Sequence, residues 1–231
     1  MPNVKFISRL FLSVIFQVAI FGSLLFLPAG SWHWPRAWIF IAVDVVATVV
    51  MMVAVFASRE ALLDERFKPA IQKGQPLADK IVLLLFLAAF CGFVAFIPLD
   101  VFRFHLARKP GILVSSIGIV LFVAGWWLMS LAFKENAFAA PVVKHQAERQ
   151  QTAVDTGVYG VVRHPMYSGL LFLAVGMSLW LESYAAVLAA AVPIAVLAVR
   201  IGIEERFLKR ELPGYEAYTQ KVRYRLIPLV W

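Results

Sequence analysis

Long apolar runs separated by short polar segments dominate the chain. The runs are Leu10–Leu27, Ala37–Ala57, Ile81–Leu99, Ile112–Phe133, Tyr167–Leu181 and Tyr184–Val199. About 20 apolar residues are needed to cross a bilayer as a helix, and only Glu182 and Ser183 separate the last two runs. The pattern therefore predicts an all-α polytopic membrane protein with five to six transmembrane helices, the last two forming a C-terminal helical hairpin.

Two of these runs need a closer look. The first could be a signal peptide, but it is longer than the usual 7–15 apolar residues and lacks a small-x-small cleavage site, so we interpret it as a retained span. The sixth contains Pro193, which removes a backbone hydrogen bond and should kink the helix.

The composition excludes most other classes of protein. Of the 231 residues, 61% are hydrophobic and 16% are charged, and no G-x-G-x-x-G run suggests a nucleotide-binding domain. We therefore treat residues 1–231 as a single integral-membrane domain. Its one cysteine, Cys91, lies inside an apolar run, so disulfide frameworks and cysteine-rich metal sites are excluded. We expect no metal.

The basic residues predict the orientation of the helices. If the N-terminus is cytoplasmic, the cytoplasmic loops and ends contain 18 of the 22 lysines and arginines, as the positive-inside rule requires. Both termini are therefore expected in the cytoplasm. The net charge of +8 would also attract anionic membrane lipids. Nucleic acid is a poor partner, because the basic residues are spread over separate loops beside the spans.

Two features lie within the predicted spans. Gly111, Gly118, Gly125 and Ala132 recur every seven residues, and such a stripe of small residues favours close helix packing. Asp44 lies well inside the second run, where a charge is costly. It is either a functional group or the partner of a structural hydrogen bond with a neighbouring helix.

Polar and aromatic groups are concentrated in residues 155–169. Pro165 can occupy the first turn of the fifth helix, which places Arg163 and His164 at an exposed helix N-terminus. This helix end and Arg163 together could hold an anionic group, and Tyr159 and Tyr167 could offer aromatic faces to a cation. The alternative is a basic and aromatic anchor for a membrane helix.

A second polar cluster follows the sixth run. Arg200 and Glu204 are four residues apart and can pair on one helix face, whereas Glu205 points about 100° away. This pattern predicts that Glu204 holds Arg200 and that Glu205 is free to face a ligand. The hairpin would bring this cluster to the same side of the membrane as Arg163 and His164.

These motifs together resemble the isoprenylcysteine carboxyl methyltransferase family and the related integral-membrane phospholipid methyltransferases. The resemblance rests on the run Arg163–Gly169 and on Thr156–Tyr159 before it. It also rests on the adjacent acids Glu204 and Glu205 and on the motif Tyr215-x-x-Tyr218. The resemblance covers roughly residues 111–228. We therefore regard residues 111–231 as a methyltransferase-like catalytic core. Val158 stands where the family usually has proline, and residues 1–110 carry no recognisable motif.

The resemblance implies S-adenosylmethionine as cofactor and a lipophilic or prenylated substrate that enters from the bilayer. The pocket would be cytoplasmic and built from loop 134–166 and the C-terminal segment. The family pattern assigns cofactor binding to Asn136, Gly157, Tyr159, Arg163, His164, Pro165, Tyr167, Tyr215 and Tyr218. It assigns catalysis to Arg200, Glu204 and Glu205.

The acceptor stays open between two chemistries. A carboxylate, as in an isoprenylcysteine, needs a positive anchor such as Arg200 or Arg163 and no base. A phospholipid amine needs a base, which would be Glu204 or Glu205. The segment 218–228, with the R-H-P-x-Y motif, also resembles NADPH-dependent membrane sterol reductases, which is the alternative function.

The polar loop 58–80 faces the same side as the predicted pocket. It mixes basic and acidic residues, among them Arg59, Glu60 and Arg66. A run of mixed charge is typical of a solvated connector, and we interpret the loop in this way.

Overall fold

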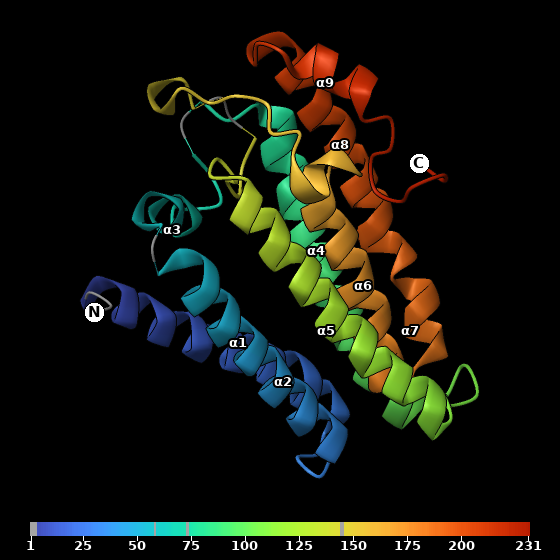
Figure 1. Cartoon of the computed structure of the whole chain (residues 1–231). Coiled ribbons are helices and arrows are strands. Elements are labelled where there is room, and N and C mark those ends of the chain that lie inside the picture. Colours follow the sequence, from blue (N-terminus) through green and yellow to red (C-terminus); the bar gives the residue numbers. More distant parts are fainter. Residues whose placement is uncertain (1–3, 58, 73, 144–145) are drawn as a thin grey trace.

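The computed structural model describes residues 4–57, 59–72, 74–143 and 146–231, and these form helices joined by turns and loops, with no strand (Figure 1). The α-helices are α1 (Val4–Ala29), α2 (Pro35–Met51), α3 (Glu60–Arg66), α4 (Leu77–Leu99), α5 (Ile112–Glu135), α6 (Pro165–Trp180), α7 (Tyr184–Ala189), α8 (Ala191–Glu211) and α9 (Tyr215–Lys221). Single π-helical turns at Met52–Phe56 and Asp100–Phe104 extend α2 and α4.

Five helical segments are long and apolar enough to cross a membrane. They are Val4–Ala29, Pro35–Phe56, Leu77–Phe104, Ile112–Glu135 and Tyr184–Glu211, and the shorter apolar helix α6 lies among them. The prediction of an all-helical, multi-pass membrane protein is confirmed.

The predicted C-terminal hairpin is present. α6 leads through a short turn into α7 and α8, and Tyr167 near the start of α6 packs in one cluster with Leu197 and Ile201 of α8. The second arm is interrupted at Ala190, three residues before Pro193. The helix is thus interrupted close to the point where the proline removes a backbone hydrogen bond, while Ala190 itself keeps right-handed helical dihedrals.

Glycines bring α5 and α6 into close contact at the centre of the bundle. A Cβ atom on Gly118 would lie 2.6 Å from the backbone nitrogen of Trp180, and one on Gly125 would lie 2.8 Å from the backbone oxygen of Gly169. On α6, Gly169 and Gly176 face α5 in return. The predicted stripe thus packs against a second stripe with the same spacing of seven residues. Gly111 has no neighbour within 4 Å of its Cβ position, so the prediction was wrong for that residue.

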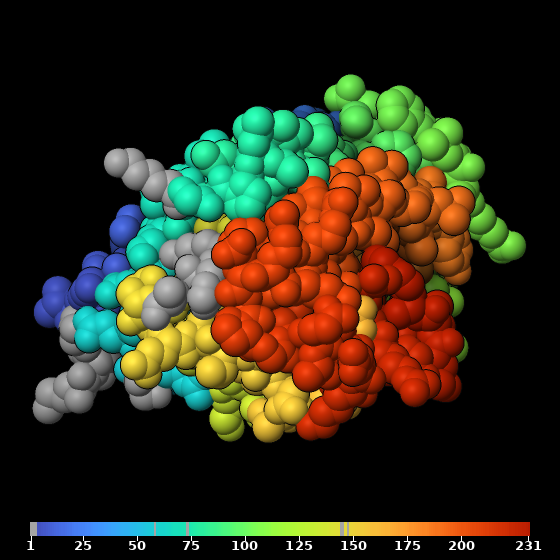
Figure 2. All heavy atoms as spheres, turned by 90° about the horizontal axis from the view of Figure 1, so that it is seen from above, coloured from blue at the N-terminus to red at the C-terminus, as the bar shows by residue number. Residues whose placement is uncertain are grey.

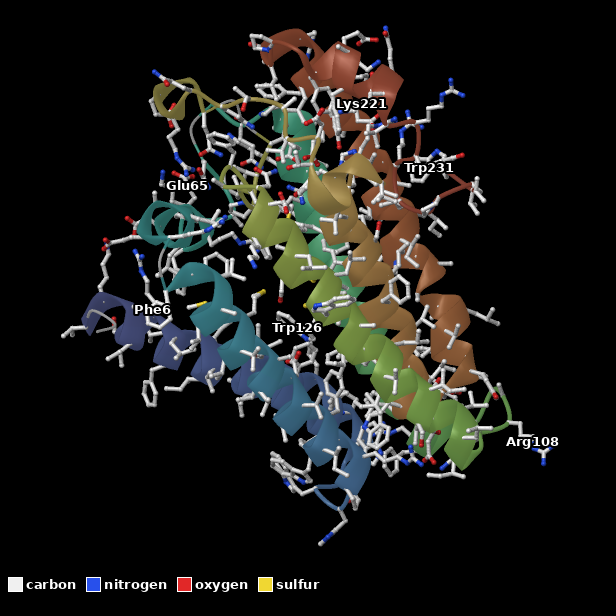
Figure 3. All side chains as sticks on the ribbon, viewed as in Figure 1. Phe6, Glu65, Arg108, Trp126, Lys221 and Trp231 are labelled. Atoms are coloured by element: carbon white, nitrogen blue, oxygen red, sulfur yellow. The ribbon has the colours of Figure 1, made fainter. Side chains whose placement is uncertain are left out.

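Asp44 joins three helices inside the membrane. It is buried and accepts hydrogen bonds from the side chains of Gln17 on α1 and Trp126 on α5, the latter over 3.0 Å. Figure 3 shows Trp126 between α2 and α5. Of the two interpretations of Asp44, the structure shows the hydrogen bond between helices.

The two ends of the bundle differ in character. At one end Arg36 pairs with Glu182 over 3.1 Å, and the Trp180 indole donates to the backbone oxygen of Arg36. Arg108 belongs to this end, and Lys221 and Trp231 lie at the other (Figure 3). The second end gathers α3, α9 and the loop between α5 and α6 (Figure 1). We call it the polar end.

Because α5 and α6 touch through their backbones, we expect Gly118→Ala to destabilise the bundle by about 1–3 kcal/mol, the usual cost of overpacking. Gly92→Ala in α4 is the matched control, because its Cβ would meet nothing within 4 Å. Thermal unfolding of both variants in the same detergent measures the difference. Equal stability of the two variants would contradict a glycine-dependent contact.

Candidate functional site

A pocket opens at the polar end, between the loop that follows α5, the start of α6 and the end of α8. Figure 2 views this end and shows the segments around residue 150 beside those near the C-terminus. Nine of the residues predicted from the sequence line this polar pocket: Asn136, Tyr159, Arg163, His164, Tyr167, Arg200, Glu204, Tyr215 and Tyr218. Residues from distant parts of the chain thus meet in one cavity.

Glu205 is the centre of a buried charge cluster beside the pocket. One carboxylate oxygen accepts from Arg163 Nε at 2.6 Å and lies 3.2 Å from His164 Nε2, and the other accepts from Arg225 Nε at 2.9 Å. The side chains of Arg163, His164 and Glu205 are all less than 10% exposed. We call these four residues the Glu205 cluster. Burial in a medium of low dielectric constant strengthens such contacts.

The same cluster fixes the segment that follows α9. Arg163 Nη1 donates to the backbone oxygens of Val222 and Arg223 at 2.7 and 2.8 Å. The backbone nitrogens of Arg163 and His164 donate to the oxygens of Tyr224 and Arg225. The loop before α6 and the segment after α9 are therefore held together by side-chain and backbone bonds alike.

These contacts correct the sequence-based view of Arg163 and His164. We expected an exposed helix start, but both side chains are buried. Arg163 already binds one carboxylate and two carbonyl oxygens, which leaves it poorly suited to be the main anchor for an anionic ligand.

Arg200 has a different partner from the one predicted. Its Nε donates to Asp79 at 3.0 Å, and its Nη2 donates to the backbone oxygen of Pro141 at 2.8 Å. Asp79 is fully buried and also accepts from Gln75 and from the backbone nitrogen of Val143. This group joins the start of α4, the loop after α5 and α8. The predicted Arg200–Glu204 pair was wrong, because a more deeply buried acid on another helix holds the arginine.

The side chains of Glu204 and Glu205 have the opposite of their predicted roles. Glu205, expected to be free, is bound by the cluster, while Glu204 lines the pocket and accepts a hydrogen bond from the Tyr167 hydroxyl at 2.7 Å. Among the described residues Glu204 forms no ion pair. The expectation that adjacent helical residues point apart holds, but it is Glu204 that faces the cavity.

Hydrogen-bonded tyrosines form another wall of the pocket. Asn136 Nδ2 donates to the Tyr159 hydroxyl at 3.3 Å, and the Tyr218 hydroxyl donates to the backbone oxygen of Tyr159 at 2.9 Å. Burial raises the pKa of Tyr159, Tyr215 and Tyr218 above the ordinary value of a phenol. These side chains are therefore neutral at physiological pH and offer hydroxyls and aromatic faces.

Two of the predicted cofactor-binding residues shape the backbone and do not line the pocket. Gly157 has a φ of +53°, and a Cβ there would lie 2.6 Å from the Glu135 carboxyl group. Pro165 is the first residue of α6, as expected from its fixed φ. Both position the loop that brings Tyr159 and Arg163 to the site.

Sequence reasoning missed Asp79 and Gln75. Both lie in or beside the 58–80 loop that we interpreted as a solvated connector, yet both are buried. The available signal was the place of Asp79, an acid only two residues before the third apolar run. A carboxylate at that depth needs a partner, and the nearby arginines of the polar end could have suggested one.

We expect Glu205→Gln to lower the free energy of unfolding by about 3 kcal/mol, because breaking a buried ion pair leaves uncompensated charges. Here Arg163 and Arg225 would lose their carboxylate. Glu211→Gln, at an exposed position of the same helix, is the control and should leave stability within about 0.5 kcal/mol. Thermal unfolding in detergent tests this, and a Glu205→Gln variant as stable as the control would contradict it.

Comparison with known proteins supports the resemblance seen in the motifs. Residues 113–213 match the family model described as phospholipid methyltransferase. This stretch contains α5, α6 and α8, and hence Arg163, Arg200 and both acids of the pair.

The chain is also similar to individual relatives that are named as isoprenylcysteine O-methyltransferases. Protein-S-isoprenylcysteine O-methyltransferase B of Arabidopsis thaliana is 31% identical over 112 residues, which are 47% of this chain and 57% of the relative. The protein-S-isoprenylcysteine O-methyltransferase of Saccharomyces cerevisiae is 30% identical over 127 residues, 54% of this chain and 52% of the relative. The matched region thus spans little more than half the length of these relatives.

A solved structure shares the fold. It is that of a eukaryotic intramembrane Ras methyltransferase, isoprenylcysteine carboxyl methyltransferase, with a TM-score of 0.53 and 20% identity. The alignment covers 93% of this chain and 75% of the solved one, so the fold likeness also includes the helices before residue 111. Residues 113–213 are thus similar to the phospholipid methyltransferase family model and to isoprenylcysteine O-methyltransferases, and the chain shares its fold with the solved enzyme.

Proposed function

We propose that the protein transfers a methyl group from S-adenosylmethionine to the carboxylate of an isoprenylcysteine-like lipophilic acceptor. The observation that carries this proposal is the polar pocket itself, in which Glu204, a carboxylate without a cationic partner among the described residues, lies beside Arg200 and a wall of tyrosines. The names of the relatives support the choice of reaction.

The residues present fit the cofactor. S-adenosylmethionine supplies, when bound, a methyl group on a positively charged sulfur. Glu204 provides the negative charge that such a cation requires, and tyrosine faces favour a cation as well. Apolar side chains in the pocket lining, including Val142, Leu208 and Leu212, suit an adenine ring.

Besides binding the cofactor, the protein has to orient the acceptor toward the methyl group. A carboxylate acceptor is already ionised at neutral pH and needs no base, so the protein has to hold it in line with the methyl group. Such alignment can contribute about 7–11 kcal/mol. Arg200 stands in the pocket wall with its Nε and Nη2 fixed by Asp79 and Pro141. The Tyr167 hydroxyl holds the Glu204 carboxylate in place.

An apolar groove suits the lipid part of the acceptor. It lies between α2 and α5, has a volume of about 650 Å³ and is lined by residues such as Val46, Val50 and Trp127. At the polar end it reaches Lys134, two residues before Asn136 in the pocket wall. A hydrocarbon chain in this groove would stay within the bilayer while its polar head reaches the pocket.

The reaction is tested with purified protein in detergent and labelled S-adenosylmethionine. We expect label in an S-farnesylcysteine derivative, released by mild base as from a methyl ester. Base-stable label in phosphatidylethanolamine would instead indicate methylation of an amine. Binding of NADPH without binding of S-adenosylmethionine would favour the reductase alternative and contradict the proposal.

The role of Glu204 has its own test. Glu204→Gln should weaken binding of S-adenosylmethionine by about tenfold or more, as expected for the loss of a charge-assisted contact. Thermal stability should change little, because the amide oxygen still accepts from Tyr167. Glu211→Gln serves again as the control of equal charge change. Unchanged cofactor affinity of the Glu204 variant would remove this acid from the site.

We infer that the polar end faces the cytoplasm, since 18 of the 22 basic residues fall on that side of the predicted topology. Figure 3 shows Arg108 and Trp231 at opposite ends, so in a Cys91→Ala background Arg108→Cys and Leu229→Cys, two residues before Trp231, report on the two ends. In sealed right-side-out vesicles, a membrane-impermeant maleimide should label position 108 and leave position 229 unlabelled until the membrane is opened. The reverse pattern would overturn the orientation.

A further inference from the structure

Arg66, a partly buried cation at the polar end, has no anionic partner among the described residues. Arg66, at the end of α3, forms neither an ion pair nor a hydrogen bond with the part of the chain that the structure describes, and its guanidinium lies 4.8 Å from the centre of the Phe133 ring. By contrast, Arg163 and Arg225 share Glu205, and Arg200 binds Asp79. A partly buried charge without a counter-charge is costly, so an external anion would relieve it.

The charge of Arg66 acts on the polar pocket. Arg66 lies close enough to Arg200, Tyr159 and Tyr167 for its charge to be felt there, and these three residues line the cavity. Burial lowers the pKa of Arg66 to about 10, so the side chain is still charged at neutral pH.

The helix that carries Arg66, α3, packs against residues of both the apolar groove and the polar pocket, while Arg66 itself lines neither. Leu62 and Leu63 of α3 belong to a cluster with Phe133, Val55 and Ala139. Val55 lines the groove, whereas Ala139 lines the pocket. Figure 3 marks α3 by Glu65.

α3 is also fixed from its other side. Lys5 of α1 pairs with Asp64 over 3.1 Å, and Arg9 bonds the same carboxylate. These cations keep the pKa of Asp64 low. The Asp64 carboxylate is therefore occupied by α1, and the Arg66 guanidinium, on the same helix, lies over Phe133.

We propose that Arg66 binds the carboxylate of a ligand held in the pocket and so selects acidic ligands. The proposal rests on the proposed function, which offers two such carboxylates: that of the acceptor and that of the amino-acid part of the cofactor. Because α3 packs against Val55 of the groove, the acceptor is the favoured ligand. Arg66 would complement Arg200, whose Nε and Nη2 are already bound within the protein.

Two matched pairs of ligands test the proposal on the full chain in detergent. One pair is N-acetyl-S-farnesylcysteine and its methyl ester, and the other is S-adenosylhomocysteine and its decarboxylated analogue. Affinities are measured for wild type, Arg66→Gln, Arg66→Lys and the control Arg210→Gln, which removes an exposed charge from α8.

We expect Arg66→Gln to weaken binding of the farnesylcysteine acid by about tenfold or more and to leave binding of the ester unchanged. Arg66→Lys should recover part of the loss, because it keeps the charge, and Arg210→Gln should behave as wild type. A selective loss in the cofactor pair would support the same role with the cofactor carboxylate as the ligand.

Equal losses for both members of each pair, or no loss in either pair, would overturn the proposal, because neither depends on a carboxylate. Failure of the proposed function looks different. In that case wild type itself would bind neither S-adenosylhomocysteine nor its analogue, while the comparison of farnesylcysteine acid and ester would still report on Arg66.

Discussion

The arrangement of the polar end depends on one buried carboxylate. Glu205 neutralises Arg163 and Arg225 and contacts His164, and these residues come from the loop before α6 and the segment after α9. None of the three segments could bury its charged groups alone, because a lone ion in a medium of low dielectric constant is strongly destabilised. The charged groups of the three segments can be buried only when they pair with one another. The position of the tyrosine wall follows, since Tyr159 and Tyr218 lie in or beside the same segments.

Two adjacent acidic residues have different roles in the structure. Glu204 faces the pocket, whereas the Glu205 carboxylate is bound by Arg163 and Arg225. The arginines are not divided in this way, because Arg163 and Arg200 are both held by acids within the protein. A site that must accept a cation and an anion at once benefits from such fixed charges, because preformed dipoles and ions need no reorganisation during the reaction.

Much of the architecture could be predicted from local patterns, and much of the site could not. Apolar runs gave the spans, and the spacing of Gly118 and Gly125 gave the helix contact, because both depend on periodicity along one helix. The partner of Arg200 could not be found in this way. Asp79 lies 121 residues away in the chain, and the rule for residues four apart favoured Glu204. Likewise Arg66 was not identified, because it lies in a loop whose mixed charge is typical of a solvated connector.

The order of the segments along the chain has a consequence for biogenesis. Residues 222–225, which complete the Glu205 cluster, are synthesised after all the membrane-spanning helices. Arg225 and the carbonyl groups of residues 222 and 223 therefore join the cluster from a segment that follows the membrane-spanning helices. The charge network is therefore complete only when the last part of the chain has packed against the helices made before it.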